Sequence, residues 1–428
     1  MTTAVAVVWD NSSKRYYPFD LNTYSFGSAY GSASLSDINT NPAPTPDGKA
    51  FIALDGNHVV LISTTGAWPD AYVTQPDQRA VAVSPDGSTV WVTDYSAGTA
   101  HPYAIDTTAG TITAGTPLPV GPQAFGLAIT PDGGTLIVGF YNSSGNISFY
   151  DIATRTLIRT VASGTTYTYC MVVSPDSSTV YVNGFVTDTI VPIDISTGAV
   201  GSFTAPTELQ EINQMAIDSG GQWLATASLH TGGGAMITAQ SLPGAGLLLF
   251  EELDLNPNTN SVSFAPDREH VLFAVEDGPL CTYETATWNL VNSDDTRSDP
   301  NATFLPDQAP TASFTSIIAG LSVAFTDTST SPAGTIVDWA WDFGDSNTST
   351  AQNPTHVYAA GGTYTVTLTV TNSAGTSTTQ TFTGQTVSNN GGPSAMASQP
   401  VTVSASGPPL GSWSKASQSN WSGQGPVV

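Results

Sequence analysis

Aromatic side chains stand beside hydroxyl and amide side chains in several short segments rich in glycine, serine and threonine. In such a segment a ring can stack on the apolar face of a sugar while a neighbouring hydroxyl or amide forms hydrogen bonds with it. Packing within the protein, or a place on the rim of a site, is the alternative role for each residue. The candidates for ligand binding are Trp68, Tyr72, Tyr95, Tyr141, Asn142 and Tyr167.

Two aspartates in the segment WDFGDS, Asp342 and Asp345, are close enough in sequence to contribute to a calcium site. Calcium binds six or more oxygen ligands, and carboxylates are among those it prefers. A turn in which each carboxylate accepts backbone hydrogen bonds explains the same pair. Calcium is therefore the one cofactor that the sequence raises, and no other is expected.

Common motifs of enzyme active sites are absent from the sequence. It contains no glycine-rich phosphate loop, no HExxH and no nucleophile elbow, and its five histidines are scattered. Cys170 and Cys281 lie in separate strand-like runs without metal-ligand spacing, so neither a metal site nor a disulfide bridge is expected. The chain is therefore expected not to be an enzyme.

An internal repeat supplies the elements that must position these side chains. Each copy alternates apolar and polar residues around a Pro-Asp-Gly turn or a close variant, a pattern typical of a β-hairpin, and a third and a fourth strand follow. The aspartates are expected to form turns rather than to catalyse. The period of about 44 residues is the size of a propeller blade. The copies are PTPDGKAFIAL (44–54), VAVSPDGSTVWV (81–92), LAITPDGGTLIV (127–138), VVSPDSSTVYV (172–182) and SFAPDREHVLFAV (263–275), with a degenerate copy at Ile217 and Asp218.

The first and last copies complete each other. The segment ATFLPDQ at 302–308 supplies only a first strand, whereas residues 4–23 align with the strands after the turn in other copies. Residues 1–308 therefore predict an all-β, seven-bladed propeller closed by N- and C-terminal strands, which hides two sheet edges. The SPDG turns followed by TVWVTDY or TVYVNGF resemble the YVTN-type β-propeller, a relative of the WD-repeat propellers. In such a fold the connections from second to third strand, and from blade to blade, gather at one end.

A proline-rich junction leads into residues 309–388, which resemble a PKD-type domain, a β-sandwich of the immunoglobulin-like kind. The resemblance lies in the segments WAWDFGDSNTST (339–350) and NPTHVYAAGGTYTVTLTVTN (353–372). The alternation places Trp339, Trp341 and Phe343 on one face of a strand. Ser346 stands where the family pattern usually has glycine. The resemblance implies display outside a cell, as a spacer or an adhesion module.

Residues 389–428 form a tail rich in glycine, serine and proline, a composition typical of a linker. Trp413 and Trp421 are costly to leave in water. They predict that the tail docks on a neighbouring subunit or partner, as part of a larger assembly.

Charge excludes two classes of partner. Nine basic residues against 34 acidic residues give a net charge of −25, which disfavours phosphate backbones and anionic lipid surfaces. No run approaches the length of a membrane-spanning helix, and no export signal precedes the first strand. Neither nucleic acid nor membrane insertion is expected.

Three functions fit these observations. The first is a non-enzymatic attachment protein on the surface of a bacteriophage virion, as a tail, fibre or head-decoration component that displays the propeller to a host or a glycan. The second is a secreted or cell-surface adhesion protein of a bacterium or archaeon. The third is a propeller enzyme such as a lactonase, which no catalytic set supports.

Overall fold

The computed structural model describes residues 5–31, 35, 41–185, 189–202, 209–230, 234–242, 246–253, 259–276, 278–297, 300–332, 335–382 and 387–405. Within these ranges the regular secondary structure consists of strands and one short 3-10 helix, η1 (Pro393–Ala395), so the all-β prediction is confirmed. Trp413 and Trp421, with the docking predicted for them, lie outside the described residues.

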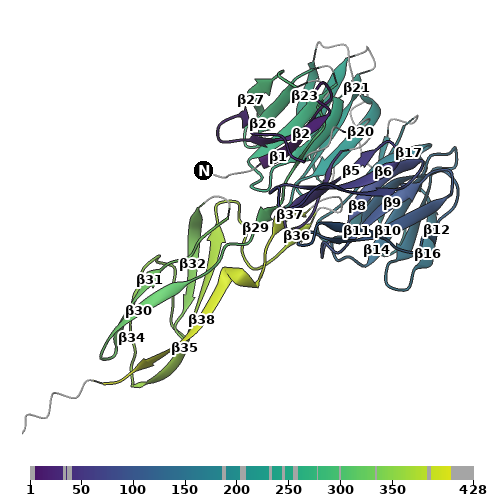
Figure 1. Cartoon of the computed structure of the whole chain (residues 1–428). Coiled ribbons are helices and arrows are strands. Elements are labelled where there is room, and N and C mark those ends of the chain that lie inside the picture. Colours follow the sequence, from purple (N-terminus) through teal and green to yellow (C-terminus); the bar gives the residue numbers. More distant parts are fainter. Residues whose placement is uncertain are drawn as a thin grey trace, which may run out of the picture.

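Residues 5–304 form small antiparallel sheets, built mainly from strands that follow one another in the chain (Figure 1). The first sheet also contains a distant strand: its order is β28 (Ala302–Phe304), β1 (Val5–Asp10), β2 (Arg15–Asp20) and β3 (Ser25–Phe26). The second sheet is β4 (Ala43–Pro44), β5 (Ala50–Asp55), β6 (His58–Ser63) and β7 (Ala71–Thr74). The third is β8 (Gln78–Val83), β9 (Thr89–Asp94), β10 (Thr99–Asp106) and β11 (Thr111–Ala114), with β12 (Leu118–Pro119) also paired to β10.

The later sheets of this region follow the same pattern. They are β13 (Ala124–Ile129), β14 (Thr135–Phe140), β15 (Asn146–Asp151) and β16 (Thr156–Ala162); then β17 (Thr168–Val173), β18 (Thr179–Gly184) and β19 (Thr189–Asp194); then β20 (Leu209–Ile217), β21 (Trp223–His230), β22 (Ala235–Ser241) and β23 (Gly246–Leu253); and then β24 (Thr259–Phe264), β25 (His270–Val275), β26 (Leu280–Glu284) and β27 (Asn289–Asp294).

The repeated Pro-Asp turns join the first strand of a sheet to the second. In one of them the Asp132 carboxylate accepts hydrogen bonds from the Thr130 hydroxyl at 2.5 Å and from the Gly134 amide at 2.9 Å. Gly133 adopts φ +73°, a left-handed conformation that glycine takes without strain. Other aspartates likewise accept from the amide two residues further on, as expected for turn formers: Asp47, Asp86, Asp176, Asp218 and Asp267.

The first strands of successive sheets lie against one another. Each first strand contacts the next, in the order β4, β8, β13, β17, β20, β24 and β28. Strand β28 in turn contacts β4. Strand β28 pairs antiparallel with β1, with Ala302 opposite Val8 and Phe304 opposite Ala6. Strands nearly 300 residues apart in the chain therefore share one sheet.

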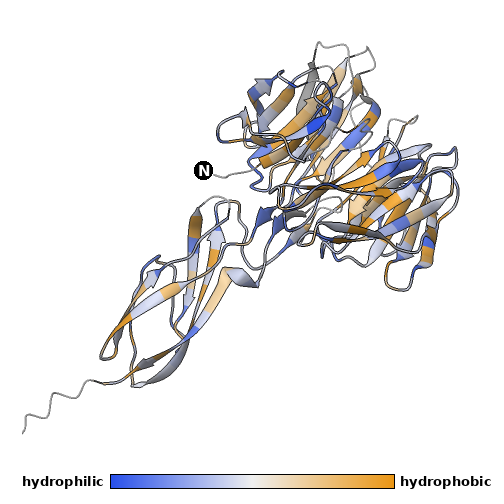
Figure 2. Ribbon diagram, viewed as in Figure 1, coloured by the Kyte–Doolittle hydropathy of each residue, from blue (hydrophilic) through white to orange (hydrophobic). Residues whose placement is uncertain are grey.

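Apolar side chains fill the space between neighbouring sheets. Leu54 and Leu61 of the second sheet pack with Val83, Val90 and Tyr103 of the third, and all five are buried. Hydrophobic residues recur along the strands in both parts of the molecule (Figure 2). The alternation in the sequence thus places its apolar face between sheets.

A β-sandwich follows and projects from the rest of the molecule (Figure 1). One of its sheets is β30 (Phe314–Ala319), β31 (Ser322–Asp327) and β34 (Thr355–Val357). The other is β33 (Thr348–Ser349), β32 (Ile336–Asp342), β35 (Gly362–Asn372) and β38 (Met396–Val403). Trp341, Phe343 and Leu368 lie in the core between them, and Trp339 packs against it.

The sandwich extends beyond the predicted boundary at residue 388. Strand β38 pairs with β35 along its whole length, and Val401 and Val403 are buried in the sandwich core. Residues 396–403, predicted as tail, therefore belong to this domain. Their alternation of small, polar and valine residues is weak in sequence, and the pairing edge of β35 is what makes a strand of them.

A short mixed sheet joins the two parts. Strand β29 (Asp307–Gln308) pairs in parallel with β37 (Val387–Asn390), which pairs with β36 (Thr381–Phe382). The Gln308 side-chain amide donates to the carbonyl of Pro46 at 2.9 Å, and that of Gln380 donates to the carbonyl of Pro85 at 2.9 Å. The segments that join the sandwich to the rest of the chain therefore contact the end of the sheets that carries the Pro-Asp turns.

Candidate functional site

The connections of an antiparallel sheet divide between its two ends. The Pro-Asp turns, which join first strands to second, and the connections from third strand to fourth lie at one end, which we call the turn end. The connections from second strand to third, and from one sheet to the next, lie at the other, which we call the open end. Because the segments that join the sandwich to the rest of the chain contact Pro46 and Pro85 at the turn end, the open end faces away from the sandwich.

Six aromatic side chains form a continuous cluster at the open end, and all six are half-buried. The ring of Phe125 lies 5.1 Å from that of Tyr141 and 5.0 Å from that of Tyr169, measured between centroids. The ring of Tyr141 also lies 5.0 Å from that of Tyr167, and the ring of Tyr169 lies 5.4 Å from that of Phe185. Tyr95 completes the cluster, with its ring edge-on to Phe125 at 6.4 Å.

Three of the six were predicted from the sequence and three were missed. The structure brings Tyr95, Tyr141 and Tyr167 together, although the first two belong to different sheets. Phe125 and Tyr169 were missed because each lies inside an apolar strand, where a core role is the simpler interpretation. The repeat contained the signal: Arg79, Phe125 and Tyr169 are separated by 46 and 44 residues, as are Tyr95, Tyr141 and Phe185.

The cluster ends at a charged pair. The Arg79 guanidinium lies 5.2 Å from the centre of the Tyr95 ring, a cation–π contact, and forms an ion pair with Asp77 at 2.5 Å. The Gln123 amide donates to the Tyr95 hydroxyl at 3.2 Å. Burial raises the pKa of the Tyr169 hydroxyl above its usual range.

A cavity of about 560 Å³ adjoins the cluster. Phe125 and Tyr169 belong to both, Arg79 at the edge of the cluster also lines the cavity, and the rest of its wall comes largely from the first strands of the sheets. Several amide side chains line it, and some of these tie one sheet to the next: the Asn213 amide donates to the carbonyl of Thr259 at 3.0 Å. The cavity therefore combines ring faces with polar groups, as ligand sites commonly do.

Trp68 and Tyr72 lie away from the cluster. The segment 64–70 joins β6 to β7, a connection from third strand to fourth, so Trp68 lies at the turn end, where its indole donates to the carbonyl of Thr107 at 3.0 Å. Tyr72 lies in β7, the last strand of its sheet, is 43% exposed and meets the ring of His58 edge-on. The prediction that both lie at the open end was wrong. It treated the segment around Trp68 as a connection from one sheet to the next, whereas the sheet has a further strand, β7, after this segment.

Asn142 shapes the loop beside Tyr141. Its side-chain oxygen accepts hydrogen bonds from the amide and the hydroxyl of Ser144 at 3.1 and 2.5 Å. Its carbonyl accepts from the Tyr167 amide at 2.8 Å, which ties two loops of the open end together. Asn142 therefore positions tyrosines of the cluster.

The predicted calcium residues take part in turns. Asp342 is exposed and accepts from the Gly344 amide at 2.8 Å, while Asp345 accepts from the Asn347 amide at 3.1 Å and from the His356 ring at 2.8 Å. Burial raises the pKa of Asp345, but the hydrogen bonds from His356 and Asn347 outweigh it and hold that pKa below its usual range. Ser346 adopts φ +73°, the left-handed conformation for which the family pattern has glycine.

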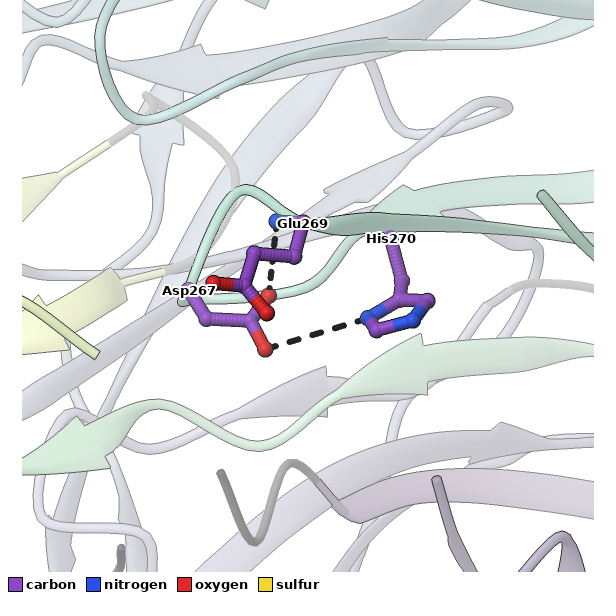
Figure 3. Close-up of side chains that lie close together, drawn as sticks. All are labelled: Asp267, Glu269 and His270. Atoms are coloured by element: carbon purple, nitrogen blue, oxygen red, sulfur yellow. Dashed lines mark hydrogen bonds and ion pairs between the residues drawn. The ribbon is translucent and has the colours of Figure 1, made fainter. Parts of the chain in front are cut away.

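Within the described part of the chain, another group has ligand atoms close enough for a metal ion. Asp267, Glu269 and His270 place one such atom each within 4.8 Å of one another (Figure 3). The Glu269 amide donates to Asp267 at 2.9 Å, and the His270 ring lies 3.8 Å from the same carboxylate. The nearby Asp267 carboxylate raises the pKa of His270 despite partial burial. A Pro-Asp turn with one ion pair accounts for this group.

Cys170 and Cys281 do not form a disulfide bridge with each other. Burial raises the pKa of the Cys170 thiol far above its usual range, so it is not a reactive thiolate. Among the described residues, no helix has the length and hydropathy needed to cross a membrane.

Comparison with known proteins identifies the sandwich. A family model for the PKD domain matches residues 307–387. This region is also similar to a segment of the pre-pro-metalloprotease PrtV of Vibrio cholerae, 48% identical over 71 residues, and of the microbial collagenase of Vibrio alginolyticus, 49% identical over 65 residues. These matches cover 17% and 15% of this chain, and the chain spans only 8% of either relative.

Solved structures resemble the rest of the chain in fold. A 6-phosphogluconolactonase-like protein from Bacteroides uniformis aligns over 71% of this chain and 99% of its own, with a TM-score of 0.57 and 16% identity. A protein of unknown function from Desulfotomaculum acetoxidans aligns over 70% and 98%, with a TM-score of 0.54 and 14% identity. At these identities the likeness concerns the fold alone. The chain thus combines a propeller-like fold with a second domain, and residues 307–387 belong to the PKD family.

Proposed function

We propose that residues 5–304 form a seven-bladed β-propeller of the YVTN type, closed by the pairing of β28 with β1. Three observations support this proposal: the consecutive antiparallel sheets of the region, the contacts that lead from β4 through the later first strands to β28 and back, and the register of β28 on β1. Closure by strands from both ends of a region leaves no unpaired inner edge.

We further propose that the chain is a non-enzymatic attachment protein, displayed on the surface of a bacteriophage virion, whose propeller binds a host or glycan ligand. The observation that carries this proposal is that two features lie at opposite ends of the sheets. The PKD domain contacts the turn end, and the aromatic cluster lies at the open end. A domain fixed at one end of a binding module leaves the other end free for a ligand. The net charge of −25 supports a partner other than nucleic acid.

The PKD relatives support display outside a cell. Their names describe a pre-pro-metalloprotease and collagenases, and collagen is an extracellular substrate. Virion proteins reach the outside by lysis of the host, so modules of this kind suit a virion surface. A secreted or cell-surface adhesion protein is the alternative carrier of the same architecture. Trp413 and Trp421 are the proposed anchor to the neighbouring protein of the particle.

Mass spectrometry of purified virus particles, compared with the envelope fraction of uninfected cells, tests the location. We expect the polypeptide at fixed stoichiometry in particles, and we expect excess purified full-length chain to block adsorption of particles to host cells. Detection in uninfected envelopes would overturn the virion location in favour of the adhesion protein. Hydrolysis of 6-phosphogluconolactone by the purified chain, with no effect on adsorption, would overturn the attachment function in favour of an enzyme.

A further inference from the structure

We propose that the six-ring cluster of Tyr95, Phe125, Tyr141, Tyr167, Tyr169 and Phe185 is a binding site for a neutral glycan. This inference rests on the attachment function proposed above and assigns its ligand class and its site. The rings lie within 5.0 to 6.4 Å of their nearest neighbours and are all half-buried. They therefore form one continuous aromatic cluster whose exposed parts can stack on sugar rings.

Polar groups within the cluster can recognise sugar hydroxyls. In the described part of the chain, no residue forms a hydrogen bond with the hydroxyl of Tyr141, Tyr167 or Tyr169. A phenol both donates and accepts, as a sugar hydroxyl does. The adjoining cavity adds amide side chains at its wall, among them Gln78 and Asn213. The cluster thus offers ring faces and hydrogen-bonding groups side by side.

The charges around the cluster favour an uncharged ligand. Arg79 is the basic residue at its edge, and Asp77 already neutralises it at 2.5 Å. Burial is the largest cause of the raised pKa of the Tyr169 hydroxyl, and the charge of Glu211 raises it further; Glu276 lines the cavity. With a net charge of −25 on the whole chain, an anionic polysaccharide would be repelled.

The backbone beneath the cluster is held in an unusual conformation. Asp77, Gln123 and Tyr167 occupy equivalent places before first strands, and each has a φ between +49° and +64° without being glycine. Their carbonyls accept hydrogen bonds from the amides of Tyr95, Tyr141 and Phe185 at 2.9 to 3.0 Å. Strained residues of this kind persist where the surrounding structure fixes them, which keeps the rings in place before a ligand arrives.

Isothermal titration calorimetry of the full-length chain with cellohexaose, chitohexaose, laminarihexaose and maltohexaose tests the site. We expect at least one of these neutral probes to bind, Tyr141→Ala to weaken its binding at least about tenfold, and Tyr141→Phe, which keeps the ring, to weaken it only a few-fold. Tyr72→Ala is the matched control, because Tyr72 is an exposed tyrosine outside the cluster, and it should leave the affinity unchanged.

Three results would overturn the inference: binding of none of the four probes, binding that Tyr141→Ala and Tyr167→Ala leave unchanged, or binding of heparin that is tighter than that of every neutral probe, which would overturn the neutral class. Adsorption assays separate this failure from failure of the attachment function. If the Tyr141→Ala chain still blocks adsorption of particles, the attachment function stands and the cluster is not its site; if the unaltered chain does not block adsorption, the attachment function itself fails.

Discussion

Ser346 has a left-handed backbone conformation in the PKD domain, with φ +73°. A side chain with a Cβ atom adopts that conformation at a cost that glycine avoids. Ser346→Gly should therefore raise the free energy of unfolding of this domain by about 0.5–1 kcal/mol. Ser346→Ala is the control, since it removes the hydroxyl and keeps the Cβ atom. Thermal unfolding followed by circular dichroism provides the measurement, and equal midpoints for the two variants would contradict the prediction.

Gly133 and Gly134 offer a matched pair in one Pro-Asp turn. Gly133 has φ +73°, whereas Gly134 lies outside the left-handed region, and an added Cβ atom at either position meets only ordinary contacts. Gly133→Ala should lower the free energy of unfolding by about 1 kcal/mol, and Gly134→Ala should change it by less than about 0.5 kcal/mol. Urea unfolding of the two variants measures the difference. Equal losses would mean that space, and not φ, limits these positions.

At the scale of elements, the junction contains a buried carboxylate whose pKa is raised. Burial raises the pKa of Asp307 more than the hydrogen bond from the Asn372 amide, at 2.6 Å, lowers it. The folded state then binds the proton more tightly than the unfolded state, so the ionised group destabilises the fold as the pH rises above about 3.8, the ordinary value. Asp307→Asn keeps an oxygen that can accept from Asn372.

We therefore expect Asp307→Asn to be more stable than the unaltered chain at neutral pH, with a difference that grows as the pH rises from about 4 and then levels off. Denaturant unfolding of both chains from pH 4 to pH 8 measures that difference. A difference that shrinks with rising pH would contradict the assigned direction.

Strand β38 makes the sandwich depend on residues beyond 388. It covers one edge of β35 and buries Val401 and Val403. Burial of each of these side chains stabilises the fold by about 1.5–3 kcal/mol. A chain that ends at residue 388 should lose the protease resistance of its PKD domain, whereas a chain that ends at Ala405 should keep it. Limited proteolysis with the cleavage sites mapped by mass spectrometry measures this. Equal resistance of the two chains would show that β38 contributes no stability.

At the scale of the whole molecule, β28 and β1 decide whether the ring is closed. The Trp9 amide donates to the carbonyl of Asn301, and the Leu305 amide donates to that of Val5, both at 2.8 Å. Val8 and Ala302 are therefore a non-hydrogen-bonded pair, the kind whose side chains lie closest. The double variant Val8→Cys with Ala302→Cys should form a disulfide.

Because that bridge would close a loop of nearly the whole propeller region, we expect it to raise the free energy of unfolding by about 3–5 kcal/mol under oxidising conditions. The single variant Val8→Cys is the control. Free thiol counts and thermal unfolding with and without reductant provide the measurement. Failure of the two cysteines to pair would contradict the proposed closure of the ring.

Much of this architecture could be predicted from local patterns. The Pro-Asp turns, the strands around them and the turn role of aspartates such as Asp132 follow from residue types whose effects act within a few residues. The PKD core around Trp341 and Leu368 follows from alternation, which is also local. Strand β38 could not be predicted in the same way, since its partner lies about 30 residues earlier in the chain and its own pattern is weak.

The sequence by itself determined the all-β class, the PKD domain, the repeat and its turns, because each of these depends on neighbours in the chain. Only the tertiary structure decided which aromatic residues meet. Tyr95 and Tyr141 join Phe125, Tyr169 and Phe185 because successive sheets bring equivalent positions side by side, while Trp68 lies at the turn end. Successive connections of an antiparallel sheet alternate between its two ends. A prediction that miscounts the strands by one therefore places a residue at the wrong end of the sheet, and its contacts with other sheets are then wrong as well.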